Sequence, residues 1–173
     1  SQEVAETTIN DNKLEANVLD FRVYNRNKET LYYSLGSAVD DASAQNIIEM
    51  WPGMYEENVV VNTRLTIIGS GTSRTIIDAR TKGAAIKFNN YQTDYSVIKN
   101  LRVTHSSETT SSCSSLNTAP NGGIVLYYSD YITIENVHFF ETYNGLMTYQ
   151  SSNLNVKNSI FDRGTLSTFN YGM

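Results

Sequence analysis

Cysteine, histidine and proline are scarce in this chain. It contains one cysteine, Cys113, two histidines and two prolines among 173 residues. A single cysteine excludes an intrachain disulfide framework and a cysteine-rich zinc site, and two histidines exclude a histidine-rich metal site. No apolar run approaches the roughly 20 residues that a membrane-spanning helix needs. We therefore expect no metal, no cofactor and no insertion into a membrane.

Charge is sparse as well. Charged residues make up 18% of the chain, and 18 acidic against 13 basic residues give a formal net charge of −5. This sign argues against nucleic acids as partners, because their backbone is polyanionic. The length suits one domain with a buried core. The chain begins with Ser1 rather than Met, which favours a mature exported protein that is extracellular, bound at the cell surface or periplasmic.

The N-terminal part of the sequence predicts an arm, a strand and a helix. Residues 1–16 are polar and aperiodic, and residues 19–24 alternate apolar and polar side chains as a short strand does. We assign residues 1–30 to this arm and strand. Apolar residues then recur at helical spacing over residues 35–44, with Ser34 as the N-cap. After this helix the sequence is typical of one strand after another.

An internal repeat is the strongest signal in the sequence. Two landmarks carry it: an asparagine that follows an alternating apolar segment, and a glycine that precedes an apolar pair. The interval from Asn136 to Asn158 is 22, and the interval from Gly123 to Gly145 is again 22. The interval from each glycine to its asparagine is 13. Two independent landmarks with one period make a chance match improbable.

The preceding unit follows the same period with insertions. The interval from Asn100 to Asn136 is 36, and its excess of 14 over the period has the size of the Ser/Thr-rich stretch 106–119, which we expect to be a loop insertion. Gly83 is taken as the glycine of this unit, and its interval to Asn100 is 17, an excess of four that residues 89–92 can absorb. Units of this kind cannot bury their own apolar edges and must stack. The asparagines, with Gly69 in the same slot, predict a left-handed turn and a stacked ladder of amides.

Four segments resemble the N-terminal cap and first coils of pectin-lyase-like right-handed parallel β-helix proteins, close to periplasmic NosD-like and other cell-surface β-helix domains. The segments are YSLGSAVDDA at 33–42, MWPGMYEENV at 50–59, LTIIGSG at 65–71 and TIID at 75–78. Repeat and resemblance together predict an all-β fold: a right-handed parallel β-helix, a solenoid of about five coils, with a short capping α-helix. This domain is expected to span residues 31–173.

The resemblance implies no particular activity, because lyases, esterases, hydrolases and non-enzymes share this opening. Pectin methylesterases would have a glutamine where this chain has Gly122-Gly123. Polygalacturonases and pectate lyases would need clustered carboxylates, whereas Asp130, Glu135 and their neighbours are scattered along the chain. No catalytic residue of the family can be carried over, so we expect a protein without catalytic activity.

Aligning the repeats on their asparagines predicts columns of outward side chains. Tyr127 and Tyr149 share one column, with Tyr128 and Phe140 nearby. Exposed aromatic rows of this kind can stack on the apolar C–H face of a pyranose ring, which makes the four residues candidates for carbohydrate binding. The competing interpretation is that aromatic cross-strand pairs stabilise the sheet.

Charged residues form further columns. Lys99, Glu135 and Lys157 alternate in sign, and Arg102 is expected beside His138. Arg102 could bind an acidic sugar, with Glu135 and His138 as acid and base. The competing interpretation is a set of surface ion pairs, each worth about 0–1 kcal/mol.

We therefore predict an exported, non-catalytic module that binds a glycan or polysaccharide or builds a cell-surface structure. Two alternatives stay open. One is the N-terminal part of a polysaccharide lyase or hydrolase whose catalytic coils lie beyond Met173. The other is a self-assembling homo-oligomer or filament, in which the N-terminal arm and the strand at 19–24 complete the open C-terminal coil of a second copy.

Overall fold

The computed structural model describes residues 21–80, 82–106, 122–163 and 165–169, the last range as backbone only. These residues form strands, one α-helix, α2 (Leu35–Asp40), and one 3-10 turn, η1 (Tyr91–Thr93). The strands are β1 (Val23–Asn25), β2 (Thr30–Tyr32), β3 (Asn46–Met50), β4 (Gly53–Tyr55), β5 (Val59–Val61), β6 (Leu65–Ile68), β7 (Thr75–Asp78), β8 (Ile86–Phe88), β9 (Val97–Thr104), β10 (Ile124–Tyr127), β11 (Thr133–Phe140), β12 (Asn144–Tyr149), β13 (Asn155–Lys157), β14 (Ile160–Asp162) and β15 (Thr165–Phe169).

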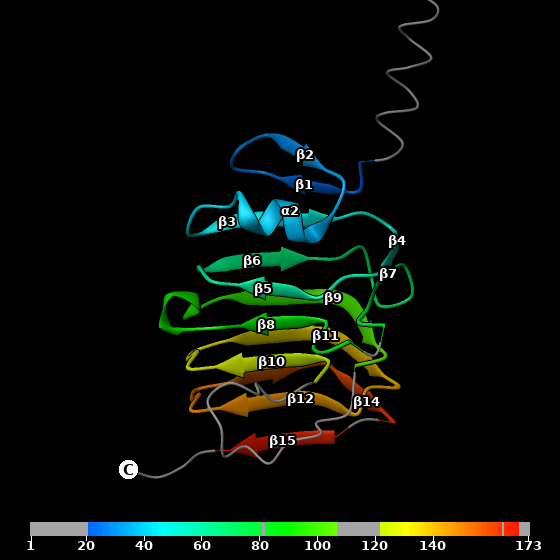
Figure 1. Ribbon diagram of the computed structural model, residues 1–173, viewed down its shortest axis with the longest axis vertical. Helices are drawn as coiled ribbons and strands as arrows, with labels where there is room; N and C mark the ends of the chain where they lie inside the picture. Colours follow the sequence, from blue (N-terminus) through cyan, green and yellow to red (C-terminus); the bar gives the residue numbers. More distant parts are fainter. Residues whose placement is uncertain (1–20, 81, 107–121, 164, 170–173) are drawn as a thin grey trace, which may run out of the picture.

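Parallel pairing joins these strands into two sheets (Figure 1). The larger has the order β13-β11-β9-β6-β3-β1-β2, with β4, β7 and β14 paired beside this path, and the smaller has the order β15-β12-β10-β8-β5. Within the described ranges, only the pairs β1–β2 and β1–β3 are antiparallel. From β5 onward the chain passes repeatedly between the two sheets, so each new strand lies beside a strand from an earlier repeat.

The strand register has the predicted period. Ile124 of β10 pairs with Leu146 of β12, an interval of 22. β9 and β11 pair with an offset of 36, since Ile98 faces Ile134. The excess over the period falls where the loop insertion was expected, but residues 107–121, including Cys113, lie outside the described part of the chain.

Aliphatic and aromatic side chains fill the space between the sheets. Alternate residues point inward and are buried, such as Ile48 and Met50 of β3 and Leu65 and Ile67 of β6, all at most 1% exposed. Equivalent positions in neighbouring strands pack on one another. Because each layer buries the apolar face of the next, the repeats stabilise one another rather than folding singly.

The helix begins as predicted and ends four residues early. The Ser34 hydroxyl accepts a hydrogen bond from the Ser37 N–H at 3.1 Å, and α2 buries Leu35, Ala38 and Val39. The expectation of a helix to residue 44 was wrong: after Asp40 the backbone tightens into a turn that leads directly into β3. A buried face of only three residues is sufficient because the helix only covers the first layer.

The strand predicted at 19–24 is displaced. β1 begins at Val23, and β2, which the sequence pattern did not predict, pairs with it as a hairpin. Phe21 precedes β1 and stacks on Tyr33, with ring centroids 4.2 Å apart. Residues 1–20, which hold the predicted arm, lie outside the described ranges.

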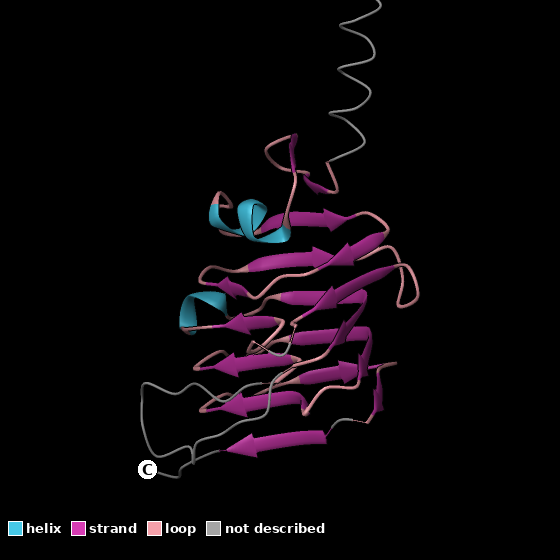
Figure 2. Cartoon of the chain, turned by 45° about the vertical axis from the view of Figure 1, so that its right-hand side comes forward, coloured by secondary structure: helices cyan, strands magenta, loops and turns pink. Residues whose placement is uncertain are grey.

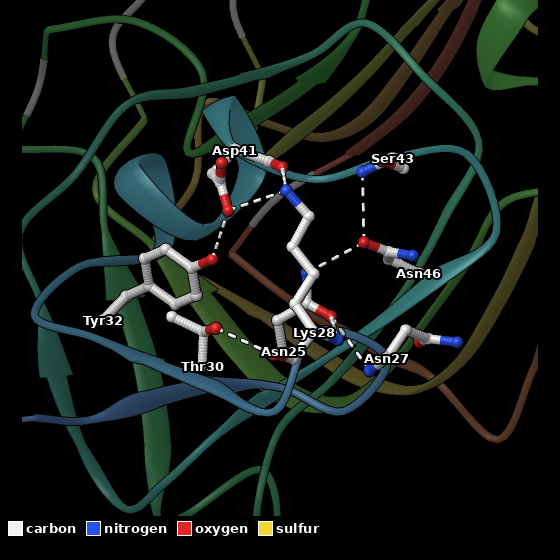
Figure 3. A network of polar contacts seen from close by, with 8 residues as sticks. All are labelled: Asn25, Asn27, Lys28, Thr30, Tyr32, Asp41, Ser43 and Asn46. Atoms are coloured by element: carbon white, nitrogen blue, oxygen red, sulfur yellow. Dashed lines mark hydrogen bonds and ion pairs between the residues drawn. The ribbon is translucent and has the colours of Figure 1, made fainter.

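Polar contacts fix this hairpin to the end of α2 and the start of β3 (Figure 3). The Asn25 amide donates to Asn46 Oδ1 at 2.9 Å, and the Lys28 ammonium pairs with Asp41 Oδ2 at 2.8 Å. The Lys28 contact, followed by the hydrogen bond from Tyr32, holds the pKa of Asp41 below its usual value. The antiparallel hairpin is thereby fixed onto the parallel stack.

Candidate functional site

Left-handed turns recur at four positions of the repeat unit. Residues with positive φ in one unit reappear with positive φ at the same place in the next, at the interval of the repeat. Because this conformation departs from the extended one, each such residue bends the chain, even where the strand continues on both sides, as β11 does around Asn136. The four pairs are Tyr128 and Gln150, Tyr131 and Asn153, Asn136 and Asn158, and Glu141 and Arg163.

The asparagine turn has the geometry that the repeat predicted. Asn100, Asn136 and Asn158 have φ values of 60°, 51° and 49°. The Asn136 amide donates to Asn100 Oδ1 at 3.0 Å, as one step of an amide ladder does. Gly69 stacks in the same column without the left-handed φ expected of it. A Cβ on Gly69 would lie 2.3 Å from the Asn100 carbonyl oxygen, so close backbone approach requires glycine there.

The strand register also corrects the expectation that Gly83 is the glycine of its repeat unit. Ile86 pairs with Ile124, so Ala85, not Gly83, occupies the position of Gly123. The insertion in this unit is therefore two residues rather than four. It lies between Phe88 and Val97, whose register partners are two residues closer together.

These two extra residues build one wall of a groove. They allow the chain to form η1, the lower of the two cyan turns in Figure 2. Tyr91 is pushed outward and is 74% exposed, and Tyr128, 44% exposed, stands in the turn of the next layer. Between them lies a groove of about 370 Å³. Its lining is Asn89, Asn90, Tyr91, Asp94, Tyr128, Asp130 and Gln150.

A ladder of buried hydroxyls underlies the groove. Thr93 and Ser129 are fully buried, and the Thr93 hydroxyl donates to Ser129 Oγ at 2.8 Å. The Ser129 hydroxyl in turn donates to the Tyr127 carbonyl at 3.0 Å. The Ser129 N–H donates to Ser151 Oγ at 3.0 Å, which continues the ladder into the next layer. Because these bonds are buried and mutually satisfied, they hold the backbone under the groove in one conformation.

Two stacked carboxylates form the polar side of the groove. Asp94 Oδ1 accepts the Asp130 N–H at 2.7 Å, and Asp130 Oδ1 accepts the Ser152 N–H at 2.6 Å. Each uses one oxygen to hold the layer beyond it, and among the described residues the second oxygen of each has no hydrogen-bond partner. The Asn90 side chain accepts from the Gln92 N–H at 2.7 Å and so fixes the turn that carries Tyr91.

The predicted aromatic column is present, but its ring faces are occupied. Tyr127 and Tyr149 stack with centroids 5.1 Å apart and planes 15° from parallel. The Lys87 ammonium lies 5.0 Å from the Tyr127 ring centroid, so both faces of that ring are in contact. Tyr128 is nearly perpendicular to the Tyr127 ring, at 86°. Tyr128 is also nearly perpendicular to the Tyr149 ring, at 72° with centroids 5.7 Å apart, and it lines the groove.

The ring faces of a second tyrosine pair are occupied in the same way. Tyr95 and Tyr131 stack at 4.7 Å with planes 5° from parallel, and the Arg64 guanidinium lies 5.4 Å from the Tyr95 centroid. A stack along the layers therefore exposes mostly ring edges and hydroxyls. Tyr128 is the predicted aromatic candidate that combines a perpendicular ring with a place in the groove.

Arg102, His138 and Phe140 lie on the larger sheet, not in the groove. Arg102 and His138 are register neighbours in β9 and β11, as predicted. The Arg102 guanidinium lies 5.3 Å and that of Arg163 5.7 Å from the Phe140 ring centroid. Phe140 is thus covered by cations and does not extend the tyrosine column.

His138 lies beside the Arg102 guanidinium, its register neighbour in β9. Burial, and then the charge of Arg102, lowers the pKa of His138 below its ordinary value. Its Nε2 is buried without a hydrogen-bond partner in the described part of the chain and lies 3.9 Å from Asp162 Oδ2. Glu135, the predicted acid partner, lies before the Asn136 turn, in register with Lys99 and Lys157.

His105 is a polar centre that the sequence did not single out. Its Nδ1 lies 3.0 Å from Asp78 Oδ2 and its Nε2 3.4 Å from Glu141 Oε2. The hydrogen bond with Asp78 is the main cause that raises the pKa of His105, opposed by partial burial. Arg163 pairs with Glu141 on its other side. Since both ring nitrogens are engaged, this cluster joins layers and offers no free base.

A larger groove at the N-terminal end has its polar groups paired. It measures about 570 Å³ and includes Arg22, Glu56 and Glu57 in its lining. Glu57 accepts the N–H groups of the first turn of α2, and Glu56 pairs with Arg80 at 2.9 Å. Arg22 donates to a backbone carbonyl at 2.9 Å. The charged side chains of this groove therefore already make contacts within the protein.

Comparison with known proteins agrees with this architecture. The family described as a right handed beta helix region matches residues 52–173, more than half of the chain. The chain belongs to this right-handed β-helix family. No curated protein and no solved structure matched it. In the described part of this β-helix protein, no helix is long and apolar enough to cross a membrane, and no three metal-ligating side chains could hold an ion.

The sequence therefore identified one groove residue, Tyr128, and missed the others. Tyr91, Asp94 and Asp130 lie in irregular or turn segments that carry no repeat landmark. A usable signal was present: the interval from Asp94 to Asp130 is 36, the same offset as that from Asn100 to Asn136.

Proposed function

We propose that this β-helix protein is a non-catalytic carbohydrate-binding module, a solenoid of about five coils that works at the cell surface or outside the cell. The observation that carries the proposal is the groove of about 370 Å³ between Tyr91 and Tyr128. Its volume is in the range of small-ligand sites.

The chemistry of the lining suits a sugar. A pyranose has an apolar C–H face and a rim of hydroxyls, so it needs one aromatic face and several planar hydrogen-bonding groups. Tyr128 supplies the face. Asp94 and Asp130 supply carboxylate oxygens that accept from hydroxyls, and Asn89 and Asn90 contribute amide groups at the rim.

Rigidity of the groove supports the proposal further. The Thr93–Ser129 ladder fixes the backbone beneath it, and Asn90 fixes the turn under Tyr91. A groove that is already ordered before binding loses less conformational entropy when the ligand binds.

The test is the binding of a panel of oligosaccharides, measured by calorimetry. We expect Tyr128→Asn to weaken binding about tenfold or more, equivalent to about 1.4 kcal/mol. Asparagine accepts the left-handed φ of 50° at this position, so the variant should fold. Tyr143→Asn is the matched control, since Tyr143 is 52% exposed and does not line the groove. Equal affinities of Tyr128→Asn and the original protein would contradict the proposal.

A second candidate function is cleavage of an acidic polysaccharide on the larger sheet. The observation that favours it is His138, which lies beside Arg102 with a lowered pKa and whose buried Nε2 has no hydrogen-bond partner among the described residues. A neutral imidazole can accept a proton, and a guanidinium can bind a uronate carboxylate. It ranks second because neither of the two grooves described above is lined by Arg102 or His138.

A further inference from the structure

We infer that the groove selects neutral or amino sugars and rejects uronic acids. This inference rests on the proposed carbohydrate-binding function and specifies its ligand. The inference distinguishes sugars by their charge, because charge is the property of a ligand that the lining residues discriminate best.

The lining carries negative charge only. Asp94 and Asp130 contribute two carboxylates, and the remaining lining groups are amides and tyrosines. The two aspartates occupy consecutive layers, because Tyr95 and Tyr131 beside them stack directly. Adjacent layers of a sheet are about 4.8 Å apart, so a ligand in the groove meets both charges at close range.

Cations near the groove do not offset this charge at its surface. Lys87 is held over Tyr127 at 5.0 Å and Arg64 over Tyr95 at 5.4 Å, and neither lines the groove. A uronate carboxylate entering the groove would therefore meet two like charges without a compensating cation from the described lining residues.

The aspartates are fixed in place. Each is tied through one oxygen to the N–H of the next layer, Asp94 to Asp130 and Asp130 to Ser152. They cannot swing away from an anionic ligand without breaking these bonds. Their second oxygens can accept hydrogen bonds from hydroxyl or ammonium groups, and charge-assisted bonds to an ammonium group are the stronger of these.

The experiment compares three oligosaccharides of equal length: a neutral glucose oligomer, a glucosamine oligomer and a galacturonate oligomer. Calorimetry is run at low salt, at a pH where amines are protonated and carboxylates ionised. We expect the glucosamine oligomer to bind most tightly and the galacturonate oligomer to bind at least about tenfold more weakly than the neutral one.

The variant Asp94→Asn/Asp130→Asn tests the cause. Its amide oxygens can still accept the two backbone N–H groups, so the turns should be kept. We expect galacturonate affinity to rise about tenfold, toward that of the neutral oligomer, and the preference for glucosamine to disappear. Glu29→Gln/Asp40→Asn is the matched control, because both side chains are exposed outside the groove and the double change removes the same two negative charges elsewhere.

The two proposals fail in different ways. Galacturonate that binds as tightly as the neutral oligomer, or a double variant with unchanged selectivity, would overturn the charge inference and leave sugar binding intact. Failure of all three oligomers to bind would overturn the proposed function and the inference with it. Strong galacturonate binding that Arg102→Gln abolishes and Tyr128→Asn spares would place the site on the larger sheet instead.

Discussion

Replacing Asn136 by alanine tests how the left-handed turns hold the layers together. Asn136 has a φ of 51°, and its amide donates to Asn100 Oδ1 at 3.0 Å. Alanine in this conformation costs about 1–2 kcal/mol, because its Cβ approaches the following carbonyl. The lost amide bond adds about 0.5–1.5 kcal/mol, at the lower end because the side chain is exposed. We expect Asn136→Ala to lower the free energy of unfolding by about 1.5–2.5 kcal/mol, the sum of the two contributions.

The two contributions can be separated. Glycine at this position loses the amide but adopts the positive φ freely, so Asn136→Gly should be more stable than Asn136→Ala. That order is the reverse of an ordinary strand position, where glycine is destabilising by roughly 0.5–1 kcal/mol relative to alanine. A double-mutant cycle with Asn100→Ala then isolates the amide pair, with an expected coupling of about 0.5–1 kcal/mol.

Urea denaturation followed by circular dichroism measures these effects. We expect the midpoint to fall while the slope m stays constant, since the surface exposed on unfolding is unchanged. An alanine variant as stable as the original protein, or a glycine variant less stable than the alanine one, would refute the reasoning about the turn.

Three further predictions follow from the packing, the histidines and the absent family motifs. Gly69→Ala should destabilise by about 1–3 kcal/mol or more in the same urea assay, because its Cβ would meet the Asn100 carbonyl oxygen at 2.3 Å. Gly36→Ala, whose Cβ would lie 3.3 Å from a Glu57 carboxylate oxygen, should cost less. The raised pKa of His105 contributes stability that is present below about pH 6.5 and is lost as the pH rises through the folded-state pKa, whereas the lowered pKa of His138 costs stability as the pH falls below about 6.5. In a plot of unfolding free energy against pH, His105→Asn should therefore flatten the alkaline limb and His138→Asn the acid limb. Limbs that stay unchanged in these variants would contradict the two assignments. The chain should leave pectate, polygalacturonate and alginate uncut with or without calcium, and unsaturated products that absorb in the ultraviolet would favour the enzymatic candidate on the larger sheet.

The regular part of the fold could be predicted because the sequence carries two independent signals for it, the 22-residue period of the repeat and the alternation of apolar and polar residues in the strands. The spacing of Asn136 and Asn158 gives the register, and alternation in segments such as 65–68 gives the buried face. Only the asparagine turn was visible, however. At the other turns, the residues with positive φ include Tyr131, Glu141 and Gln150, and these residue types have no preference for positive φ from which the turn could be predicted. Packing of the layers on both sides imposes that conformation against local preference.

The N-terminal hairpin shows a different limit. β2 is three residues long, and none of them is buried. Its place depends on contacts with residues distant in sequence, such as Lys28 with Asp41. A short strand without an inward apolar set gives no period to read, so neither its existence nor the late start of β1 could follow from the sequence pattern.

The groove was missed for a reason that follows from stacking itself. In a regular column each side chain lies against its own copy in the next layer, so ring faces and amide groups are occupied within the protein, as Tyr127 and Tyr149 illustrate. An aromatic ring that is not covered by its own copy requires a break in the column. The two-residue insertion that projects Tyr91 is such a break. Binding sites in such a stacked protein should therefore be sought where the period fails, although the period is the signal that makes the fold readable.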